Sequence, residues 1–173
     1  MRCAMTDREY PDFSDGVWDD GEWISWDWIN QQVYEQDLRK KYSQAEPELI
    51  EVFERFVELA ADYKLLTGHY LQVWGELGEL YAQIKFGIKR HRPKSQGSDG
   101  KIGNDFVEIK TISPEKSKHE IAVKRAGHFS KLVVVKVSED FEFEARIIDR
   151  HALRKGTGKV ASVPWQQMPK PSK

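Results

Sequence analysis

Hydrophobic residues recur every three or four positions through the first half of this chain, which is the spacing of helices with one apolar face. The spacing predicts three helices, over about 26–42, 46–66 and 70–87. Ser25 is the expected N-cap of the first helix, because its side chain can accept a backbone N–H, and Gly68 is the expected end of the second. One stripe of the second helix is expected to be buried: Leu49, Val52, Phe53, Phe56, Val57, Ala60 and Tyr63.

The second half of the chain has shorter apolar runs with alternating positions, which favour strands. Besides a hairpin over 99–112, strands are expected at 119–123, 131–137 and 141–148. The run 131–137 is the most apolar of them and is expected at the centre of the sheet. Helices followed by strands in this order predict an α+β (α/β-like) fold with a mixed central β-sheet flanked by helices.

The same order divides the chain into four parts: an irregular, acidic, Trp-rich segment at 1–24, a helical N-terminal extension at 25–68, an α/β core at 69–155 and an extended tail at 156–173. Trp165 is the residue of the tail that is suited to dock on the core. Four tryptophans near the N-terminus stand beside acidic residues that would repel phosphate, so packing or a protein interface is expected there rather than base stacking. They are Trp18, Trp23, Trp26 and Trp28.

Charge is distributed unevenly along the chain. Residues 1–84 hold 7 Lys/Arg and 18 Asp/Glu, a net charge of −11, whereas residues 85–173 hold 20 and 10, a net charge of +10. A basic half suits contact with a polyanion such as nucleic acid. Neutralisation of one half by the other is an equally open interpretation.

Two further features concern the compartment. No apolar run reaches the roughly 18 residues of a membrane span, so no membrane segment is expected. The single cysteine, Cys3, and an N-terminus without an apolar signal region predict a reducing, cytoplasmic setting.

The strongest local signal is a β-hairpin around the two-residue turn Gly103-Asn104. That turn predicts four opposed pairs of residues: Ile102–Asp105, Lys101–Phe106, Gly100–Val107 and Asp99–Glu108. Because strand side chains alternate, Glu108 and Lys110 are expected on one face, with Val107, Ile109 and Thr111 on the other.

Two carboxylates and an ammonium group are therefore expected to converge on one small patch. Opposed like charges destabilise a hairpin, and a hard divalent cation such as Mg²⁺ (or Mn²⁺) would compensate by binding the carboxylate oxygens of Asp99 and Glu108. A solvated cluster of surface charges is the alternative. The loop before the hairpin is basic and suited to guiding phosphates, although a solvated loop would have the same composition. Its cations are Lys89, Arg90, Arg92 and Lys94.

A helix glutamate, then Asp99, then Glu108-Ile109-Lys110 and further strands resembles the PD-(D/E)xK nuclease superfamily, whose members have a restriction-endonuclease-like fold. The resemblance covers about residues 70–150, and it departs from the motif at Ser98, where the name of the superfamily has proline.

The resemblance implies roles for individual residues. Asp99 and Glu108 would bind Mg²⁺ or Mn²⁺, with the Ile109 carbonyl as a further ligand. Lys110 would orient or activate the attacking water. An accessory acid would come from the helix, and the choice between its two glutamates, Glu79 and its rival Glu76, stays open with Glu79 preferred.

These expectations describe a divalent-metal-dependent endonuclease that hydrolyses phosphodiester bonds of nucleic acid. DNA is preferred over RNA through the resemblance alone. The alternative is a catalytically silent, nuclease-like module that binds nucleic acid or a protein partner. The acidic, Trp-rich N-terminus is the expected contact for a protein partner or for a second copy of the chain in a homodimer.

Overall fold

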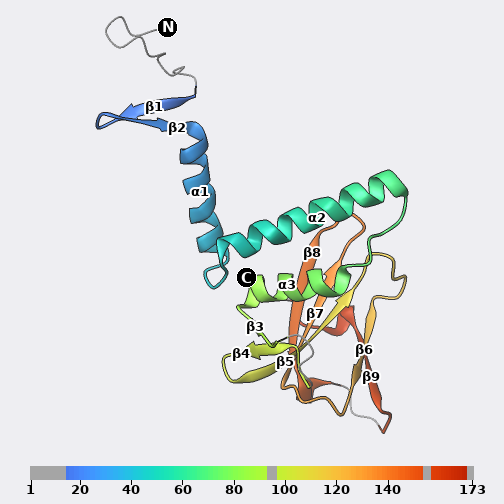
Figure 1. Ribbon diagram of the computed structural model, residues 1–173. Helices are drawn as coiled ribbons and strands as arrows, with labels where there is room; N and C mark the ends of the chain where they lie inside the picture. The colour runs from blue at the N-terminus through green and yellow to red at the C-terminus, as the bar shows by residue number, and fades with distance from the viewer. Residues whose placement is uncertain (1–14, 93–96, 154–156, 171–173) are drawn as a thin grey trace, which may run out of the picture. The chain divides into compact units, whose positions relative to one another are not determined.

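The computed structural model describes residues 15–92, 97–153 and 157–170 (Figure 1). Its helices and mixed sheets confirm the predicted α+β class with a mixed central sheet. The chain forms two compact units, residues 1–43 (unit 1) and residues 44–173 (unit 2).

Unit 1 comprises a hairpin and one helix: β1 (Gly16–Asp19), β2 (Glu22–Ser25) and α1 (Trp26–Lys41). Asp20 and Gly21 form the turn with φ values of +42° and +85°, as a type I′ turn requires. The prediction of irregular structure is therefore wrong for 16–24, because the Asp-Gly turn holds two short strands together. The predicted N-cap is confirmed, since Ser25 Oγ accepts the Trp28 N–H at 3.2 Å. Residues 1–14 lie outside the described residues.

The described residues of unit 2 form two α-helices, two sheets and two short 3₁₀ helices. In chain order they are α2 (Pro47–Thr67), α3 (Trp74–Phe86), β3 (Lys89–Arg90), β4 (Gly100–Ile102), β5 (Asp105–Ile112), β6 (Glu120–Lys124), β7 (Lys131–Val137), β8 (Phe143–Asp149), η1 (Arg150–Ala152), β9 (Val160–Pro164) and η2 (Trp165–Gln167). Figure 1 shows the five-stranded sheet, whose order is β3-β4-β5-β7-β8, and beside it the antiparallel pair β6-β9. Among the paired strands that the structure describes, β5 and β7 run parallel to each other and the other pairs are antiparallel.

The strands fit the sequence pattern closely. β7 is buried along four consecutive residues and lies between β5 and β8, which confirms the prediction of a buried strand inside the sheet. The third helix is shorter than predicted and begins at Trp74 rather than at Tyr70. The extended tail is more ordered than expected, because β9 pairs with β6 over five residues.

One face of the central sheet is covered by helices. Side chains of β5, β7 and β8 on this face, including Val107, Ile109 and Val133, pack with Ala82 of α3. Ala60 of α2 packs with Trp74 and Leu77 of α3 and with Val137 of β7 in a separate apolar cluster. Figure 1 shows α2 and α3 on the same side of the sheet.

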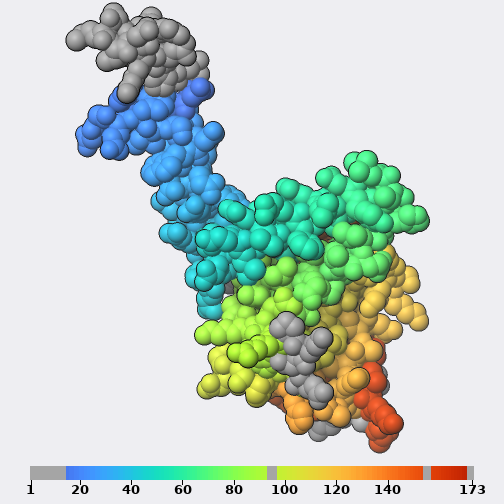
Figure 2. Space-filling model, in the orientation of Figure 1, coloured from blue at the N-terminus to red at the C-terminus, as the bar shows by residue number. Residues whose placement is uncertain are grey.

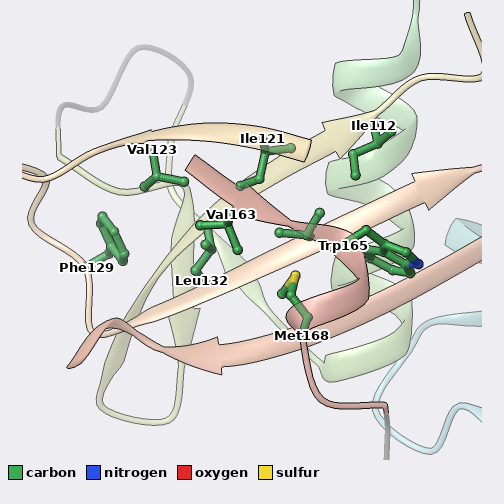
Figure 3. Packing of buried hydrophobic residues seen from close by; sticks show 9 residues of the cluster. Ile112, Ile121, Val123, Phe129, Leu132, Val163, Trp165 and Met168 are labelled. Atoms are coloured by element: carbon green, nitrogen blue, oxygen red, sulfur yellow. The ribbon is translucent and has the colours of Figure 1, made fainter. Parts of the chain in front are cut away.

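The other face of the sheet is covered by β6, β9, the 3₁₀ helix η2 and Met168, which follows η2. Figure 3 shows the apolar side chains that fill this layer, with Leu132 from the central sheet beside Val163 of β9, and with Met168 and Trp165 in the same cluster. Arg146 of β8 fixes the tail, because its guanidinium donates to the Trp165 carbonyl at 3.0 Å and to the Met168 carbonyl at 3.1 Å. Trp165 is only 5% exposed, so its predicted docking is confirmed.

The buried stripe predicted for α2 is only partly correct. Ala60 is buried, and Phe53 and Val57 pack against the apolar cluster that Ala60 forms with α3 and β7. Three residues of the predicted stripe instead face outward: Val52 (40% exposed), Phe56 (38%) and Tyr63 (39%). The prediction failed because α2 has apolar residues on more of its circumference than unit 2 covers. Within the described part of the chain, no helix combines the length and the apolar character needed to cross a membrane.

Candidate metal and nucleic-acid site

The hairpin of β4 and β5 has the register that its turn predicts. Gly103 has a φ of +57°, and the pairs Ile102–Asp105, Lys101–Phe106 and Gly100–Val107 are all present. Positive φ at the first turn residue is what a type II′ turn requires, and it is readily adopted by glycine. Three of the four predicted pairs are therefore confirmed.

The fourth predicted pair, Asp99 with Glu108, is not part of the ladder, because β4 begins at Gly100. The Asp99 N–H donates to the Val107 carbonyl at 2.9 Å, and its Oδ2 accepts the Ile109 N–H at 2.6 Å. The Asp99 carboxylate thus accepts the Ile109 N–H, which a backbone carbonyl of a neighbouring strand would otherwise accept. This contact holds Asp99 against the edge of β5, one residue beyond the position that the simple register predicted.

The edge of β5 at this point is open. β4 pairs only with the first three residues of β5, so after Val107 the described residues supply no strand on this side. In a strand the N–H and C=O of one residue point in the same lateral direction. Since the Ile109 N–H meets the Asp99 carboxylate, the Ile109 carbonyl is directed to the same open edge. Two oxygen donors of the predicted metal site therefore lie on one edge.

Glu108 and Lys110 lie on one face of β5, as the alternation predicted. Lys110 Nζ forms an ion pair with Glu108 Oε1 at 2.6 Å, and both side chains are partly exposed. Their strand neighbours Val107 and Ile109 are buried under α3 on the opposite face. The ion pair fixes the ammonium group next to the second predicted carboxylate.

Helix α3 reaches this site through an unusually close contact with β5. A Cβ added at Gly78 would lie 1.9 Å from Thr111 Oγ1 and 3.0 Å from the Thr111 Cβ, so only glycine permits this approach. The next residue, Glu79, lines a hollow of about 370 Å³ together with Ile109 and Lys110. Gly78 therefore lets α3 lie close enough to β5 for Glu79 to come near Ile109 and Lys110.

The pKa of Glu79 is shifted by burial and by three charged residues near its carboxylate. Burial raises the pKa of Glu79 above its ordinary value, the nearby Arg90 opposes that shift, and the charges of Asp99 and Glu76 add to it. Asp99 is thus close enough to Glu79 for their carboxylates to repel each other. The carboxylate of Asp99, which is held at the edge of β5, therefore lies near the carboxylate of Glu79 on α3.

Arg90 compensates these acids, although the sequence analysis had assigned it to phosphate contacts. Its Nη2 lies 3.0 Å from Glu76 Oε2 and 2.5 Å from Glu79 Oε2. The side chain of Glu76 is 69% exposed and that of Glu79 only 28%. Glu79 is thus the more buried of the two acids, and it also lines the hollow beside Lys110.

The four predicted phosphate-guiding cations have different surroundings. Lys89 is exposed on the short strand β3, and Arg92 is exposed just beyond it. Arg90 is engaged by the two glutamates of α3. Lys94 lies outside the described residues. The hollow also contains Lys116, a cation that sequence reasoning did not assign to the site because it follows the hairpin in a turn.

A metal ion at this site would need several donor atoms close to one point. Among the residues that the structure describes, no three side chains of His, Cys, Asp or Glu are grouped closely enough to hold one. The carboxylates of Asp99, Glu79 and Glu108 are therefore not gathered around one point. The donors that the prediction names are these three carboxylates and the Ile109 carbonyl, all of them oxygens. Oxygen donors of this kind fit Mg²⁺ or Mn²⁺, which also retain several waters when bound to proteins.

The tryptophans of unit 1 are largely at its surface. Trp18, Trp26 and Trp28 are 50%, 45% and 57% exposed, and Trp18 meets Trp23 edge to face at 5.8 Å between ring centroids. The expectation of a protein interface on this segment stays a prediction.

Comparison with known proteins gave no assignment. A scan against protein-family models found no matching family, and a search of curated proteins found no matching sequence.

Proposed function

We propose that this protein is a divalent-metal-dependent nuclease that hydrolyses phosphodiester bonds of nucleic acid, with DNA as the preferred substrate. One observation carries the proposal: the Asp99 carboxylate is bound to the Ile109 N–H at the open edge of β5, directly before Lys110 and close to Glu79. The order and spacing of these residues resemble the PD-(D/E)xK nucleases. Reducing, cytoplasmic conditions are part of the same proposal, because the chain has one cysteine.

Each residue has a distinct role in this proposal. Asp99, Glu108 and the Ile109 carbonyl would hold Mg²⁺ or Mn²⁺, and Glu79 would act as the accessory acid. When bound, such an ion polarises a phosphate and lowers the pKa of a coordinated water. The chain itself excludes water from one side of the site, because Ile109 and Val107 are buried beneath α3.

Lys110 would orient the attacking water or a phosphate oxygen. An ammonium group has three donors, and only one is needed for the contact with Glu108 Oε1 at 2.6 Å. Its remaining N–H groups are available to a water or to a non-bridging oxygen. Its positive charge would also offset the negative charge that develops on the phosphate in the transition state. Lys89, Arg92 and Lys94 would contact flanking phosphates, which contributes affinity but no direct sequence reading.

A second candidate function is supported by the ion pairs of the site. Arg90 already neutralises Glu76 and Glu79, and Lys110 already neutralises Glu108. A nuclease-like module that binds nucleic acid or a protein without cutting would need such internal compensation. The two functions make different predictions for the same variants.

The experiment measures cleavage of plasmid and of linear duplex DNA with Mg²⁺, with Mn²⁺ and with a chelator. Asp99→Asn and Lys110→Ala should each abolish metal-dependent cleavage and leave the circular dichroism spectrum unchanged. Matched controls from the same hairpin are Asp105→Asn and Lys101→Ala, which should cleave at the wild-type rate. Full activity in either site variant would refute the assignment. DNA binding in a gel-shift assay with no cleavage under any metal condition would support the binding module instead.

A further inference from the structure

Helix α2 has a second apolar stripe, which unit 2 leaves exposed. Figure 2 shows the outer surface of α2, coloured cyan to green, as a continuous ridge along unit 2. The stripe consists of Val52 (40% exposed), Phe56 (38%), Leu59 (58%), Tyr63 (39%) and Leu66 (83%). Large apolar side chains in an unbroken row on a protein surface mark an interaction site more often than scattered ones do.

The spacing of the stripe identifies the kind of partner that it fits. Successive members are four, three, four and three residues apart, which is the a/d pattern of a coiled coil. The helix has 21 residues, enough for three heptads. The residues that α2 uses for its own core, such as Phe53, Val57 and Ala60, lie roughly a third of a turn away from this stripe. The exposed row is therefore a separate seam that fits another helix.

The charges beside the seam indicate that the other helix is a second α2. Arg55 and Asp62 are seven residues apart, so they occupy the same heptad position on the flank of the seam that faces away from the core residues. When two such helices pair antiparallel, this flank of one helix meets the same flank of the other. Arg55 then lies beside Asp62 of the partner subunit, and the two-fold symmetry repeats the contact.

The apolar layers of such a pair are also self-complementary. With the two-fold axis between Phe56 and Leu59, Phe56 meets Leu59 of the partner subunit, and Val52 meets Tyr63 of the partner subunit. Each layer combines one larger and one smaller side chain. A parallel pair would instead bring this charged flank against Phe53 and Ala60, which are already used in the core.

We propose that α2 forms an antiparallel coiled coil with α2 of a second copy of this chain, so that the protein is a homodimer. The proposal is independent of the nuclease assignment, and its tests need no catalytic readout. It also places dimerisation on unit 2 rather than on the Trp-rich N-terminus. Because the helix is already folded against α3, association does not have to pay the cost of forming it.

The first experiment is sedimentation equilibrium of the full chain from about 1 to 100 μM, a range matched to a small helical interface. The wild type should be a dimer in the upper part of this range. Leu59→Glu should raise the dimer dissociation constant at least about 100-fold, since two buried leucines are lost per dimer. The matched control is Leu65→Glu, because Leu65 is 84% exposed on the same helix but lies off the stripe. Both variants should keep the wild-type circular dichroism spectrum.

The second experiment tests the orientation. Arg55→Asp alone and Asp62→Arg alone should each weaken the homodimer about tenfold at low salt, because each variant places like charges opposite each other twice. Mixing the two single variants should restore wild-type affinity as a heterodimer, since every opposed pair then has opposite signs. A double variant with both changes should also dimerise normally.

Three results would overturn the proposal. One is a monomeric wild type at 100 μM. Another is a dimer that Leu59→Glu leaves intact. The third is a mixture of charge variants that is no tighter than either variant alone, which would exclude antiparallel pairing.

Discussion

The close contact between Gly78 and Thr111 gives a direct test of how the fold positions Glu79. The change is Gly78→Ala, which adds a single methyl group. That group would lie 1.9 Å from Thr111 Oγ1, 3.0 Å from Thr111 Cβ and 3.1 Å from Thr111 Cγ2. Rotation of the threonine side chain cannot relieve all three contacts, because the Cβ position is fixed by β5. The helix must therefore move away from the strand.

The expected change in the free energy of unfolding of Gly78→Ala combines two effects of opposite sign. Replacing a helical glycine by alanine gains up to about 1 kcal/mol from helix propensity alone. Overpacking a rigid contact costs about 1–3 kcal/mol. Gly75 provides the matched control, since it lies in the same helix and has no heavy atom within 4 Å of an added Cβ. The difference between the two alanine variants isolates the clash, and Gly78→Ala should be less stable than Gly75→Ala by at least about 1 kcal/mol.

The assay is urea unfolding followed by circular dichroism, for each variant alone and in a Thr111→Ala background. Removing Oγ1 and Cγ2 of Thr111 leaves only the 3.0 Å contact with Cβ, so Thr111→Ala should recover part of the loss. A coupling of at least about 0.5 kcal/mol between positions 78 and 111 is expected, and none between 75 and 111. Equal stability of the two alanine variants, or no coupling with Thr111, would refute this account of the contact.

The remaining predictions concern the carboxylates. Burial raises the pKa of Glu79 above its ordinary value of 4.5, so its stabilising contribution is present below that value and is lost as pH rises through the raised pKa. The stability of Glu79→Gln relative to the wild type should therefore increase as the pH rises above 4.5 in chemical denaturation, and a difference that does not change with pH would contradict the shift. Asp99→Asn should raise the melting temperature of the metal-free protein by removing the repulsion of Glu79, while Mg²⁺ should raise the wild-type melting temperature more than that of the variant. Equal Mg²⁺ shifts would count against a metal site at Asp99.

The sequence predicted the hairpin well because its determinants are local. Gly103-Asn104 sets the turn, and the turn sets the register of the three pairs that follow. The prediction failed at Asp99, where a side chain competes with the backbone for the Ile109 N–H. Acidic side chains often bind nearby backbone groups, but the residue at which one ends a ladder depends on the strand that follows it.

The hairpin of unit 1 was missed although its signal is local. Asp20-Gly21 is a strong type I′ turn sequence, and Val17 and Ile24 flank it as an opposed pair. The high content of Asp and Gly in this segment suggested irregular structure instead. The exposed stripe of α2 was misread for a different reason, since apolar spacing shows which residues seek burial but not which partner provides it.

The position of Arg90 bears on the charge asymmetry of the chain, for which two interpretations were open. Arg90 belongs to the basic half, yet it binds Glu76 and Glu79 of the acidic half within unit 2. Strand β3 makes this possible, because pairing of Arg90 with Gly100 fixes its backbone beside α3. At this place the two halves neutralise each other, and the excess of positive charge that could meet nucleic acid must come from other cations. Lys89 is exposed on β3, and Lys110 and Lys116 line the hollow. Under the proposed function these three cations are therefore better candidates for phosphate contacts than Arg90, whereas the sequence analysis treated Arg90 like the other loop cations.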